Sequence, residues 1–267
     1  MFDKRFYYLI KIQYLGYRFH GWQKQPDVKT IHLMIDRTLK YILGDIRFKT
    51  LGSGRTDAMV SANEAALELF IYNEPIINFE DFLELFNHNL PQDIRALSIE
   101  EVDKDFNIIQ DSKLKEYHYV FSQGQKNHPF CAPILATILE PLNVELMKEG
   151  AKLFQGTHNF KTYCYKATDK GEYVRTIESS EIVDNTIYTA NFFPETSYVF
   201  KVKGKGFMRN QIRLIFGCLI KLGRGEITLE YIRNTLKEDS VEVMDYIAPA
   251  SGLILHALDF EQKKGIR

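Results

Sequence analysis

The sequence has few of the features that mark secreted or membrane proteins. Its three cysteines, Cys131, Cys164 and Cys218, are far apart and form no CxxC pair, so we expect neither a disulfide framework nor a thiolate metal site. Charged residues at positions 3–5 interrupt the N-terminal segment, and no long uncharged run follows. We therefore expect no signal peptide, no membrane span and a cytoplasmic protein.

Motifs for common cofactors are also missing. The stretch GSGRTDAM (Gly52–Met59) fits neither the P-loop nor the dinucleotide-binding pattern, and an aspartate at position 57 would repel a bound phosphate. No G-x-S-x-G nucleophile motif occurs, and His118, His128 and His158 lack metal-ligand spacing. The sequence thus predicts no metal and no nucleotide cofactor. A plain turn at Asp57 remains an alternative to a held catalytic carboxylate.

Charge is balanced over the whole chain but unevenly distributed along it. The 267 residues carry a net charge of −1, yet residues 4–25 and 201–224 contain lysines and arginines and no acidic residue. Such stretches are typical either of solvated faces or of nucleic-acid surfaces. With 45% apolar and 26% charged residues, the composition is that of a globular protein with one large domain or two smaller ones.

Hydrophobic periodicity predicts an α+β protein with the order β-α-β-β-α-β in its first half, the split βαβ or ferredoxin-like pattern. Its expected elements are strand 6–14, helix 31–42, strands 46–51 and 65–72, helix 79–86 and strand 93–102. The second half is similar but longer, with strand 117–121, helix 144–154, a hairpin of 177–184 and 187–193, strand 198–202, helices 211–222 and 229–237, and strand 253–260. We expect two ferredoxin-like subdomains, 1–104 and 105–267, whose sheets join into one mixed, mainly antiparallel sheet. Helices would pack outside, and a catalytic cleft would lie between the halves.

Aromatic and basic residues alternate in GYRFHGWQKQ (Gly16–Gln25). The stretch is too polar and too glycine-broken for a core, so we expect it to expose Tyr17, Phe19, His20 and Trp22 to an RNA backbone and unstacked bases. KGKGF (Lys203–Phe207) resembles part of the RNP1 signature, although Lys205 stands where that signature has an aromatic residue. Arg213 lies in an otherwise apolar helix, from which it could either reach solvent or a carboxylate.

Eight ordered motifs resemble the tRNA pseudouridine synthase A family over nearly the whole chain. They are YLGYRFHGWQKQ (Tyr14–Gln25), GRTDA (Gly54–Ala58), NHNLPQDI (Asn87–Ile94), KEYHYVF (Lys115–Phe121), FQGTHNF (Phe154–Phe160), VRTI (Val174–Ile177), GFMRNQIRLIFG (Gly206–Gly217) and APASGLIL (Ala248–Leu255). The resemblance implies an isomerase that converts uridine to pseudouridine, most often in the anticodon stem-loop of tRNA. It also implies a cofactor-free reaction and a homodimer in which one RNA bridges both subunits.

The resemblance assigns roles to three residues of the reaction. Asp57 matches the catalytic aspartate, Tyr117 the tyrosine that stacks on the target uracil and could aid the final C5 deprotonation, and Arg213 the basic partner of the aspartate. Arg55 matches an arginine implicated in RNA handling. The RNA-binding residues that we expect from this match and from the charge pattern are Arg55, Tyr17, Arg18, His20, Trp22, Gln23, Lys24, Lys203, Lys205 and Arg209.

Four positions depart from the family pattern. Met59 and Ser61 replace the glycine and histidine of GRTDAGVHA, Ile109 stands where an arginine is usual, and the stretch around Arg209 lacks the usual histidine or tyrosine. Met59 accepts a positive φ less readily than glycine, so the turn after Asp57 is expected to differ. The catalytic set is complete and the recognition set altered. The alternatives are therefore the same chemistry on rRNA or another RNA, or an RNA-binding module without turnover.

Overall fold

The computed structural model describes residues 4–168 and 170–260, which form two compact units. One unit contains residues 4–113 together with 255–260, and the other contains residues 114–254. The compact units divide between residues 113 and 114, later in the chain than the predicted subdomain boundary between residues 104 and 105. The subdomain boundary itself stays a prediction. Residues 106 and 108 pack into the core of the first unit, and so does Leu258 from the last strand.

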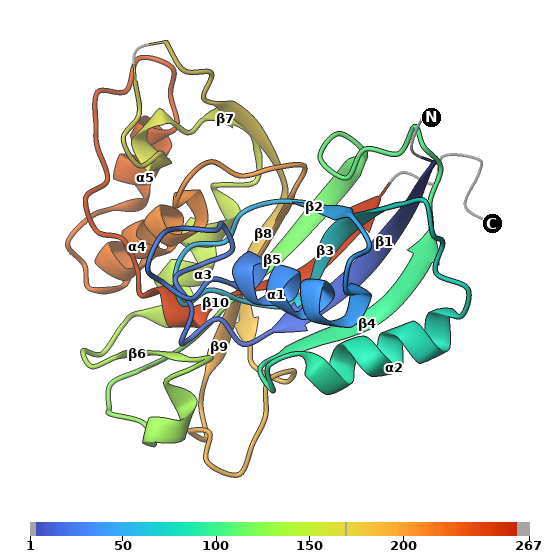
Figure 1. Ribbon diagram of the computed structural model, residues 1–267. Helices are drawn as coiled ribbons and strands as arrows, with labels where there is room; N and C mark the ends of the chain where they lie inside the picture. Colours follow the sequence, from blue (N-terminus) through green and yellow to red (C-terminus); the bar gives the residue numbers. More distant parts are fainter. Residues whose placement is uncertain (1–3, 169, 261–267) are drawn as a thin grey trace. The chain divides into compact units, whose positions relative to one another are not determined.

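The first unit has the predicted order β-α-β-β-α-β. Its elements are β1 (Arg5–Tyr14), α1 (Ile31–Leu43), β2 (Phe48–Gly52), β3 (Ser61–Tyr72), α2 (Phe79–Asn89) and β4 (Ile94–Glu101), and the final strand β10 (Leu253–Phe260) ends in this unit (Figure 1). The strands follow the order β4-β1-β3-β10, with β2 also paired to β3. The pairs β1–β3, β1–β4 and β2–β3 are all antiparallel.

Both helices of this unit begin at residues that the sequence identifies as caps. The Thr30 hydroxyl accepts a hydrogen bond from the amide of Leu33, and Asn78 accepts from Glu80 and Asp81, which satisfies amides that a helix start leaves unpaired. The apolar sides of α1 and α2, with Ile35, Leu39, Phe82 and Phe86 buried, cover one face of the strands (Figure 1).

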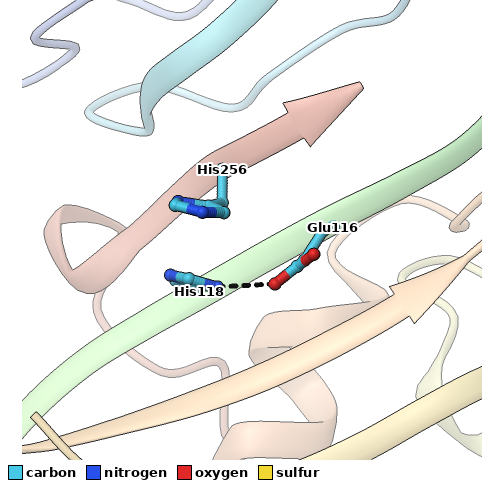
Figure 2. Close-up of side chains that lie close together, drawn as sticks. All are labelled: Glu116, His118 and His256. Carbon is cyan, nitrogen blue, oxygen red and sulfur yellow. Dashed lines mark hydrogen bonds and ion pairs between the residues drawn. The ribbon is translucent and has the colours of Figure 1, made fainter. Parts of the chain in front are cut away.

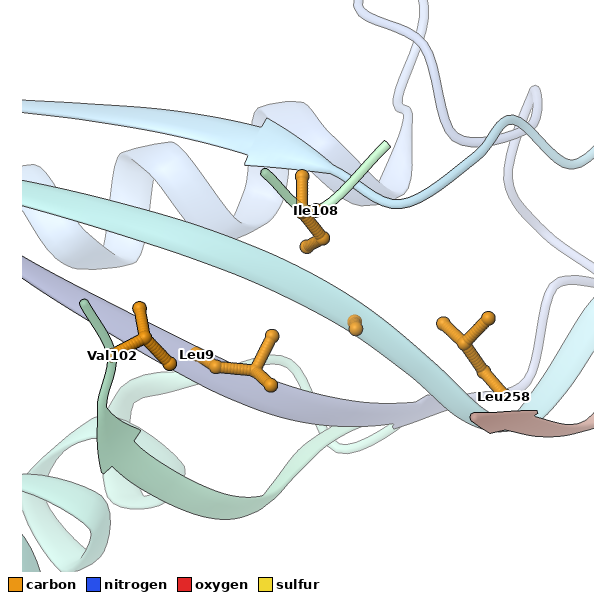
Figure 3. Packing of buried hydrophobic residues seen from close by; sticks show 5 residues of the cluster. Leu9, Val102, Ile108 and Leu258 are labelled. Carbon is orange, nitrogen blue, oxygen red and sulfur yellow. The ribbon is translucent and has the colours of Figure 1, made fainter. Parts of the chain in front are cut away.

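The two faces of the first sheet differ in what covers them. Tyr8 and the other even-numbered residues of β1 point toward the helices, since the ring of Tyr8 lies edge-on to Phe79 at 5.8 Å. The odd-numbered Leu9 packs on the opposite face with Ala66, Val102, Ile108 and Leu258 (Figure 3). Each such Leu or Ile stabilises the fold by roughly 1.5–3 kcal/mol relative to exposure. Both faces are therefore apolar at their centres.

The second unit is built around a more apolar helix. Its strands are β5 (Ser112–Gln123), β6 (Ala136–Ile138), β7 (Gly156–Asn159), β8 (Val174–Asp184) and β9 (Tyr198–Gly204), and its helices are α3 (Val144–Lys152), α4 (Gln211–Gly223), α5 (Leu229–Thr235) and the short η1 (Pro129–Cys131), η2 (Lys161–Tyr163) and η3 (Ala250–Gly252). The strand order is β5-β9-β8-β7, and β6 pairs with β5 in parallel. The ring of Phe216 in α4 stacks on Tyr119 of β5 at 4.0 Å. Between residues 4 and 260, no described helix is long and apolar enough to cross a membrane.

The predicted hairpin between 177–184 and 187–193 is wrong in its second strand. β8 pairs instead with β9, across the irregular segment 185–197. Asn185 explains the difference, because its side-chain oxygen accepts from the amides of Ile187 and Tyr188 and its nitrogen donates to the Tyr188 carbonyl. These local bonds replace the ladder bonds of a strand.

Glu68 is a buried carboxylic acid on the face of the first sheet opposite the helices. Its side chain is 2% exposed and accepts a bond from the Ile108 amide at 3.3 Å. Burial raises the pKa of Glu68, and the nearby Asp111 adds to this rise against the lowering effects of that hydrogen bond and of Lys49. A folded pKa above the unfolded one means that folding favours the protonated acid. The contribution of Glu68 to the free energy of unfolding is therefore fully present below the pKa of the unfolded state. It is lost as pH rises through the pKa of the folded state.

We predict that Glu68→Gln raises the thermal midpoint of unfolding at pH 7–8 and that its advantage over the wild type disappears near pH 4. Glutamine keeps an oxygen acceptor for the Ile108 amide but needs no buried negative charge. Melting curves across this pH range test the prediction, with the exposed Glu74→Gln as a control that should follow the wild type. A Glu68→Gln variant less stable than the wild type at pH 8 would contradict it.

Candidate active site

Asp57 lies in the loop of residues 53–60 that joins β2 to β3. The loop leaves the sheet with the Ser53 amide bonded to the Ala66 carbonyl at 3.0 Å, and it turns back where the Val60 amide donates to the Asp57 carbonyl at 3.3 Å. The Asp57 side chain is half-buried, whereas its neighbours Arg55 and Ala58 are exposed. We call residues 53–60 the aspartate loop.

A second loop, residues 15–30, packs against the aspartate loop and is here called the aromatic loop. The Trp22 amide donates to the Thr56 carbonyl at 3.1 Å, and the Met59 amide donates to the Phe19 carbonyl at 3.1 Å. The hydroxyls of Tyr14 and Thr56 share a hydrogen bond of 2.9 Å. These three bonds hold the residues on both sides of Asp57, which therefore sits on a fixed backbone.

Glycines allow this close approach of the two loops. A Cβ at Gly16 would lie 1.9 Å from the Val60 carbonyl oxygen, and one at Gly21 would lie 2.6 Å from the Thr56 oxygen. Gly21 also has a φ of 83°, which L-residues rarely adopt. The two glycines of GYRFHG are thus required by contact between the loops.

Trp22 and Phe19 are buried, so the expectation that the aromatic loop exposes them is wrong. Trp22 is 3% and Phe19 2% exposed. The Trp22 indole stacks on His32 at 5.7 Å and lies against Gly52, where a Cβ would come within 2.4 Å of its Nε1 atom. An aromatic ring that is filling the gap above a glycine cannot also serve as an RNA platform. Tyr17, which is 42% exposed, and His20 remain on the surface.

A polar network lies behind the indole. His32 donates from Nε2 to the Thr50 hydroxyl at 2.7 Å, and that hydroxyl donates to Asp36 at 2.6 Å. Burial lowers the pKa of His32, and Asp36 opposes this shift. The network orients His32 under Trp22 and so extends the support of the loops into helix α1.

Several cations of the acid-free stretches have acidic partners from elsewhere in the chain. Arg18 forms a two-pronged ion pair with Asp93, with Nη2 2.8 Å from Oδ1, and Lys24 pairs with Asp36. Lys203 lies 3.9 Å from Glu116. Among the described residues, by contrast, Arg55, Lys205 and Arg209 have no carboxylate within ion-pair distance. The charge available for RNA is therefore smaller than the sequence pattern indicated.

The other two predicted reaction residues belong to the second unit. Tyr117 of β5 is half-buried, and its ring lies edge-on to Phe207 at 5.5 Å. Arg213, in the first turn of α4, donates from Nε to the Ala248 carbonyl at 2.8 Å and from Nη1 to the Asn210 side chain at 3.4 Å. The backbone thus orients its guanidinium. Asp57 and Arg213 lie in different units, and their pairing stays a prediction.

Tyr165 was missed by the sequence interpretation. The guanidinium of Arg209 lies over its ring at 4.9 Å and the ammonium of Lys166 at 5.5 Å, and the Tyr165 amide donates to the Arg209 carbonyl at 3.2 Å. No motif marks this residue, because its partner Arg209 follows much later in the chain. Tyr165 and Lys166 extend the predicted RNA-binding group around Arg209.

His118 is a structural residue of β5. It is 1% exposed, with Nε2 2.8 Å from a Glu116 oxygen and Nδ1 3.0 Å from the Tyr188 hydroxyl (Figure 2). Since a carboxylate only accepts, Nε2 carries the hydrogen of the bond to Glu116. Both ring nitrogens are therefore used within the second unit.

Met59 and Ser61, two of the residues that depart from the family pattern, both form hydrogen bonds with the aromatic loop. Met59 adopts a positive φ of 67°, a conformation that methionine accepts less readily than glycine. The buried Ser61 hydroxyl accepts from the Gly16 amide at 2.9 Å and ties the aromatic loop to the start of β3. Ile109 is 62% exposed in the segment before β5.

Comparison with known proteins agrees with the motifs. The family model of tRNA pseudouridine synthase matches residues 151–261. tRNA pseudouridine synthase A of Pseudothermotoga lettingae is 32% identical over 249 residues, 93% of this chain and 97% of that protein. The protein of the same name in Thermosipho melanesiensis is 32% identical over 259 residues, 96% of this chain and 100% of its own. tRNA pseudouridine synthase A 2 of Bacillus cereus is 32% identical over 256 residues, 95% and 99% of the two chains.

The chain is therefore a member of the pseudouridine synthases, a class of isomerases. Within this class it belongs to the tRNA pseudouridine synthase A family, as the eight motifs predicted.

We predict that Met59→Gly raises the free energy of unfolding by about 0.5–1 kcal/mol. A non-glycine residue in the left-handed region costs about 1–2 kcal/mol, and glycine removes this strain. The greater conformational entropy of glycine in the unfolded chain offsets part of that stabilisation. Met59→Val should instead destabilise by about 1 kcal/mol or more, because a β-branched residue fits a positive φ poorly. Urea unfolding of the two variants measures both effects, and equal stabilities would show that the turn is not strained.

Proposed function

We propose that this chain isomerises uridine to pseudouridine in tRNA, in the anticodon stem-loop, with Asp57 as the catalytic group and no cofactor. The observation that carries the proposal is the presentation of Asp57. Its carboxylate is half-buried on a loop whose backbone is bonded to the aromatic loop at Thr56 and Met59, on either side of it. Its relatives, named tRNA pseudouridine synthase A, support the choice of substrate.

The reaction needs a group that acts at the sugar. The N1–C1′ bond of uridine breaks, the detached uracil turns, C5 bonds to C1′, and the C5 proton leaves, so that atoms and electrons balance without an oxidant or a second substrate. Asp57 serves this in either of two ways: its carboxylate attacks C1′, or it removes a sugar proton to give a glycal. In both, it acts in the ionised form.

Tyr117 and Arg213 complete the proposed reaction set. The target uridine has to leave its stack at a cost of a few kcal/mol, and stacking on the Tyr117 ring offsets about 1–3 kcal/mol of this. Arg213 would favour the ionised form of Asp57 by pairing with it. Its guanidinium is oriented by the Ala248 carbonyl and Asn210, which supports this role.

RNA contacts are proposed for the exposed members of the predicted set. Tyr17, His20 and Gln23 lie on the surface of the aromatic loop, and Arg55 lies on the surface of the aspartate loop in the same unit. Lys205 and Arg209, with Tyr165, supply contacts from the second unit. Binding by these cations releases counterions, so affinity should fall steeply with salt. The cytoplasmic location and the homodimer remain predictions. The mass of the protein in solution, measured by light scattering, tests the homodimer.

We predict that Asp57→Asn abolishes pseudouridine formation in tRNA while tRNA affinity stays within about threefold of the wild type. Asparagine has nearly the same shape but can neither attack C1′ nor take a proton. Mass spectrometry of digested tRNA measures the product, and fluorescence anisotropy measures binding. The matched control is Asp27→Asn, which changes an exposed aspartate of the aromatic loop and should retain turnover. Turnover by Asp57→Asn would reject the assigned nucleophile, and product at an rRNA site alone would reassign the substrate.

We predict that Asp57 and Arg213 are coupled in stability by about 0.5–3 kcal/mol, the range expected for residues in contact. Arg213→Gln should destabilise the wild type more than it destabilises the Asp57→Asn variant, because in the latter no negative charge is left without its partner. Urea unfolding of the wild type, the two single variants and the double variant gives the coupling energy of this double-mutant cycle. Additive effects of the two substitutions would show that the pair does not form.

A further inference from the structure

Two cations lie over one aromatic ring in the second unit. The guanidinium of Arg209 is 4.9 Å and the ammonium of Lys166 is 5.5 Å from the centre of the Tyr165 ring. The Tyr165 amide also donates to the Arg209 carbonyl at 3.2 Å, so the backbones of the two segments are joined at the same place. We call Tyr165, Lys166 and Arg209 the tyrosine–cation site.

The backbone turns sharply directly after each member of the Tyr165–Arg209 pair. Lys166 follows Tyr165 with a φ of 56°, and Asn210 follows Arg209 with a φ of 57°. Residues other than glycine adopt this left-handed conformation rarely, and they keep it where the surrounding structure imposes it. The Leu214 amide donates to the Asn210 carbonyl at 2.9 Å, which fixes the start of α4 at this turn. Arg209 is therefore presented from a defined backbone.

The two cations are placed to meet an anion. Arg209 and Lys166 are exposed, whereas Tyr165 is half-buried. Within residues 4–168 and 170–260, neither cation has a carboxylate within ion-pair distance. The ring attracts both cations through its negative face, and a guanidinium stacked on a ring keeps its N–H edge for an acceptor. That edge matches the oxygens of a phosphate, which a lysine also binds as a point charge.

The site lies beside two residues of the proposed reaction, all of them in the second unit. The Phe207 ring, two residues before Arg209, is edge-on to the Tyr117 ring at 5.5 Å. Asn210, the residue after Arg209, accepts from Arg213 Nη1 at 3.4 Å. Two residues span at most about 7 Å, the length of roughly two stacked nucleotides at ~3.4 Å each. An occupant of the site is therefore a near neighbour of a uracil stacked on Tyr117.

We infer that the tyrosine–cation site binds the phosphate backbone of the substrate RNA next to the uridine that is isomerised. The inference rests on the proposed function for the identity of the RNA and for the role of Tyr117. Phosphate is favoured over a base because the ring already carries two cations, whose own charge favours an anion. Such a contact positions the strand without reading its sequence. Arg209 lies in the stretch that departs from the family pattern, so the contact depends on a residue that this pattern does not supply.

The test combines variants of the protein with neutral replacements in the RNA. Arg209→Gln/Lys166→Gln removes the charges of the site, and Arg233→Gln/Lys152→Gln removes an exposed arginine and an exposed lysine from helices α5 and α3 of the same unit. The RNAs are a full-length tRNA transcript and a hairpin of its anticodon stem and loop. In further hairpins, each phosphate near the target uridine is replaced in turn by an uncharged methylphosphonate. Fluorescence anisotropy over a salt series gives affinities, and thermal melts check folding.

We expect the site variant to bind tRNA and hairpin about tenfold more weakly, by similar factors, because the contact lies next to the target. The slope of log affinity against log salt should fall by about 1–2, since the two lost cations contribute about 0.7–0.9 each. At one phosphate or more, the methylphosphonate should weaken wild-type binding at least fivefold and binding by the site variant less than twofold. The control variant should stay within threefold of the wild type and keep the full methylphosphonate effect.

Conservative substitutions separate a phosphate from a base as the occupant. Arg209→Lys keeps a charge for a phosphate but loses the flat guanidinium, so its affinity for the hairpin should stay within about threefold of the wild type. A loss by Arg209→Lys as large as that by Arg209→Gln would show that the guanidinium stacks on a base, and would overturn the inference. Tyr165→Phe should bind as the wild type does, because phenylalanine keeps the ring under the cations.

Methylphosphonate effects that are equal in the wild type and the site variant at every position would overturn the inference. So would a loss confined to full-length tRNA, which would place the contact away from the target. If the double variant does not fold, Arg209→Gln alone decides through the same comparison. The proposed function is tested separately by pseudouridine in the wild-type reaction. Its absence would defeat that function, while the tRNA affinities and salt slopes of the site and control variants would still decide whether the site binds RNA.

Discussion

The packing of the Trp22 indole on Gly52 is the contact on which the candidate site depends. A side chain at position 52 would meet the indole at 2.4 Å, so glycine and tryptophan form a matched pair at the point where β2 gives way to the aspartate loop. With the indole seated, the Trp22 amide reaches the Thr56 carbonyl. A buried aromatic residue thereby helps to position the loop that carries Asp57. Although the aromatic loop is polar in sequence, its residues Phe19 and Trp22 are buried.

Strain in the aspartate loop is offset by these contacts. Met59 holds a positive φ of 67°, at a cost of about 1–2 kcal/mol, while its amide bonds to Phe19 and Ser61 binds the Gly16 amide. Strained residues persist where the surroundings over-determine them, and such places are often functional. The methionine and serine that depart from the family pattern are therefore accommodated by the geometry that keeps Asp57 in place.

Local rules predicted the elements well and the surface less well. The caps Thr30 and Asn78 and the periodicity of the first half gave its strands and helices, because those signals are contained in adjacent residues. Partners distant in sequence could not be predicted: Asp93 comes to Arg18, and Gly52 makes room for Trp22. An acid-free stretch in the sequence is consequently not an acid-free surface. In the second unit, side-chain bonds of one asparagine replaced an expected strand. The family motifs identified Asp57 and Arg213 as candidates, whereas their mutual geometry depends on the arrangement of two separate units.

Amide hydrogen exchange by NMR on the Gly52→Ala variant tests the central claim most directly. If Trp22 and Gly52 fix the aspartate loop, the amides of Trp22 and Met59 will exchange at least tenfold faster than in the wild type, while the amides of β1 and β3 keep their protection. Pseudouridine formation by Gly52→Ala should fall, whereas its binding of tRNA should be unchanged. Unchanged exchange at Trp22 and Met59, with full turnover, would contradict the account.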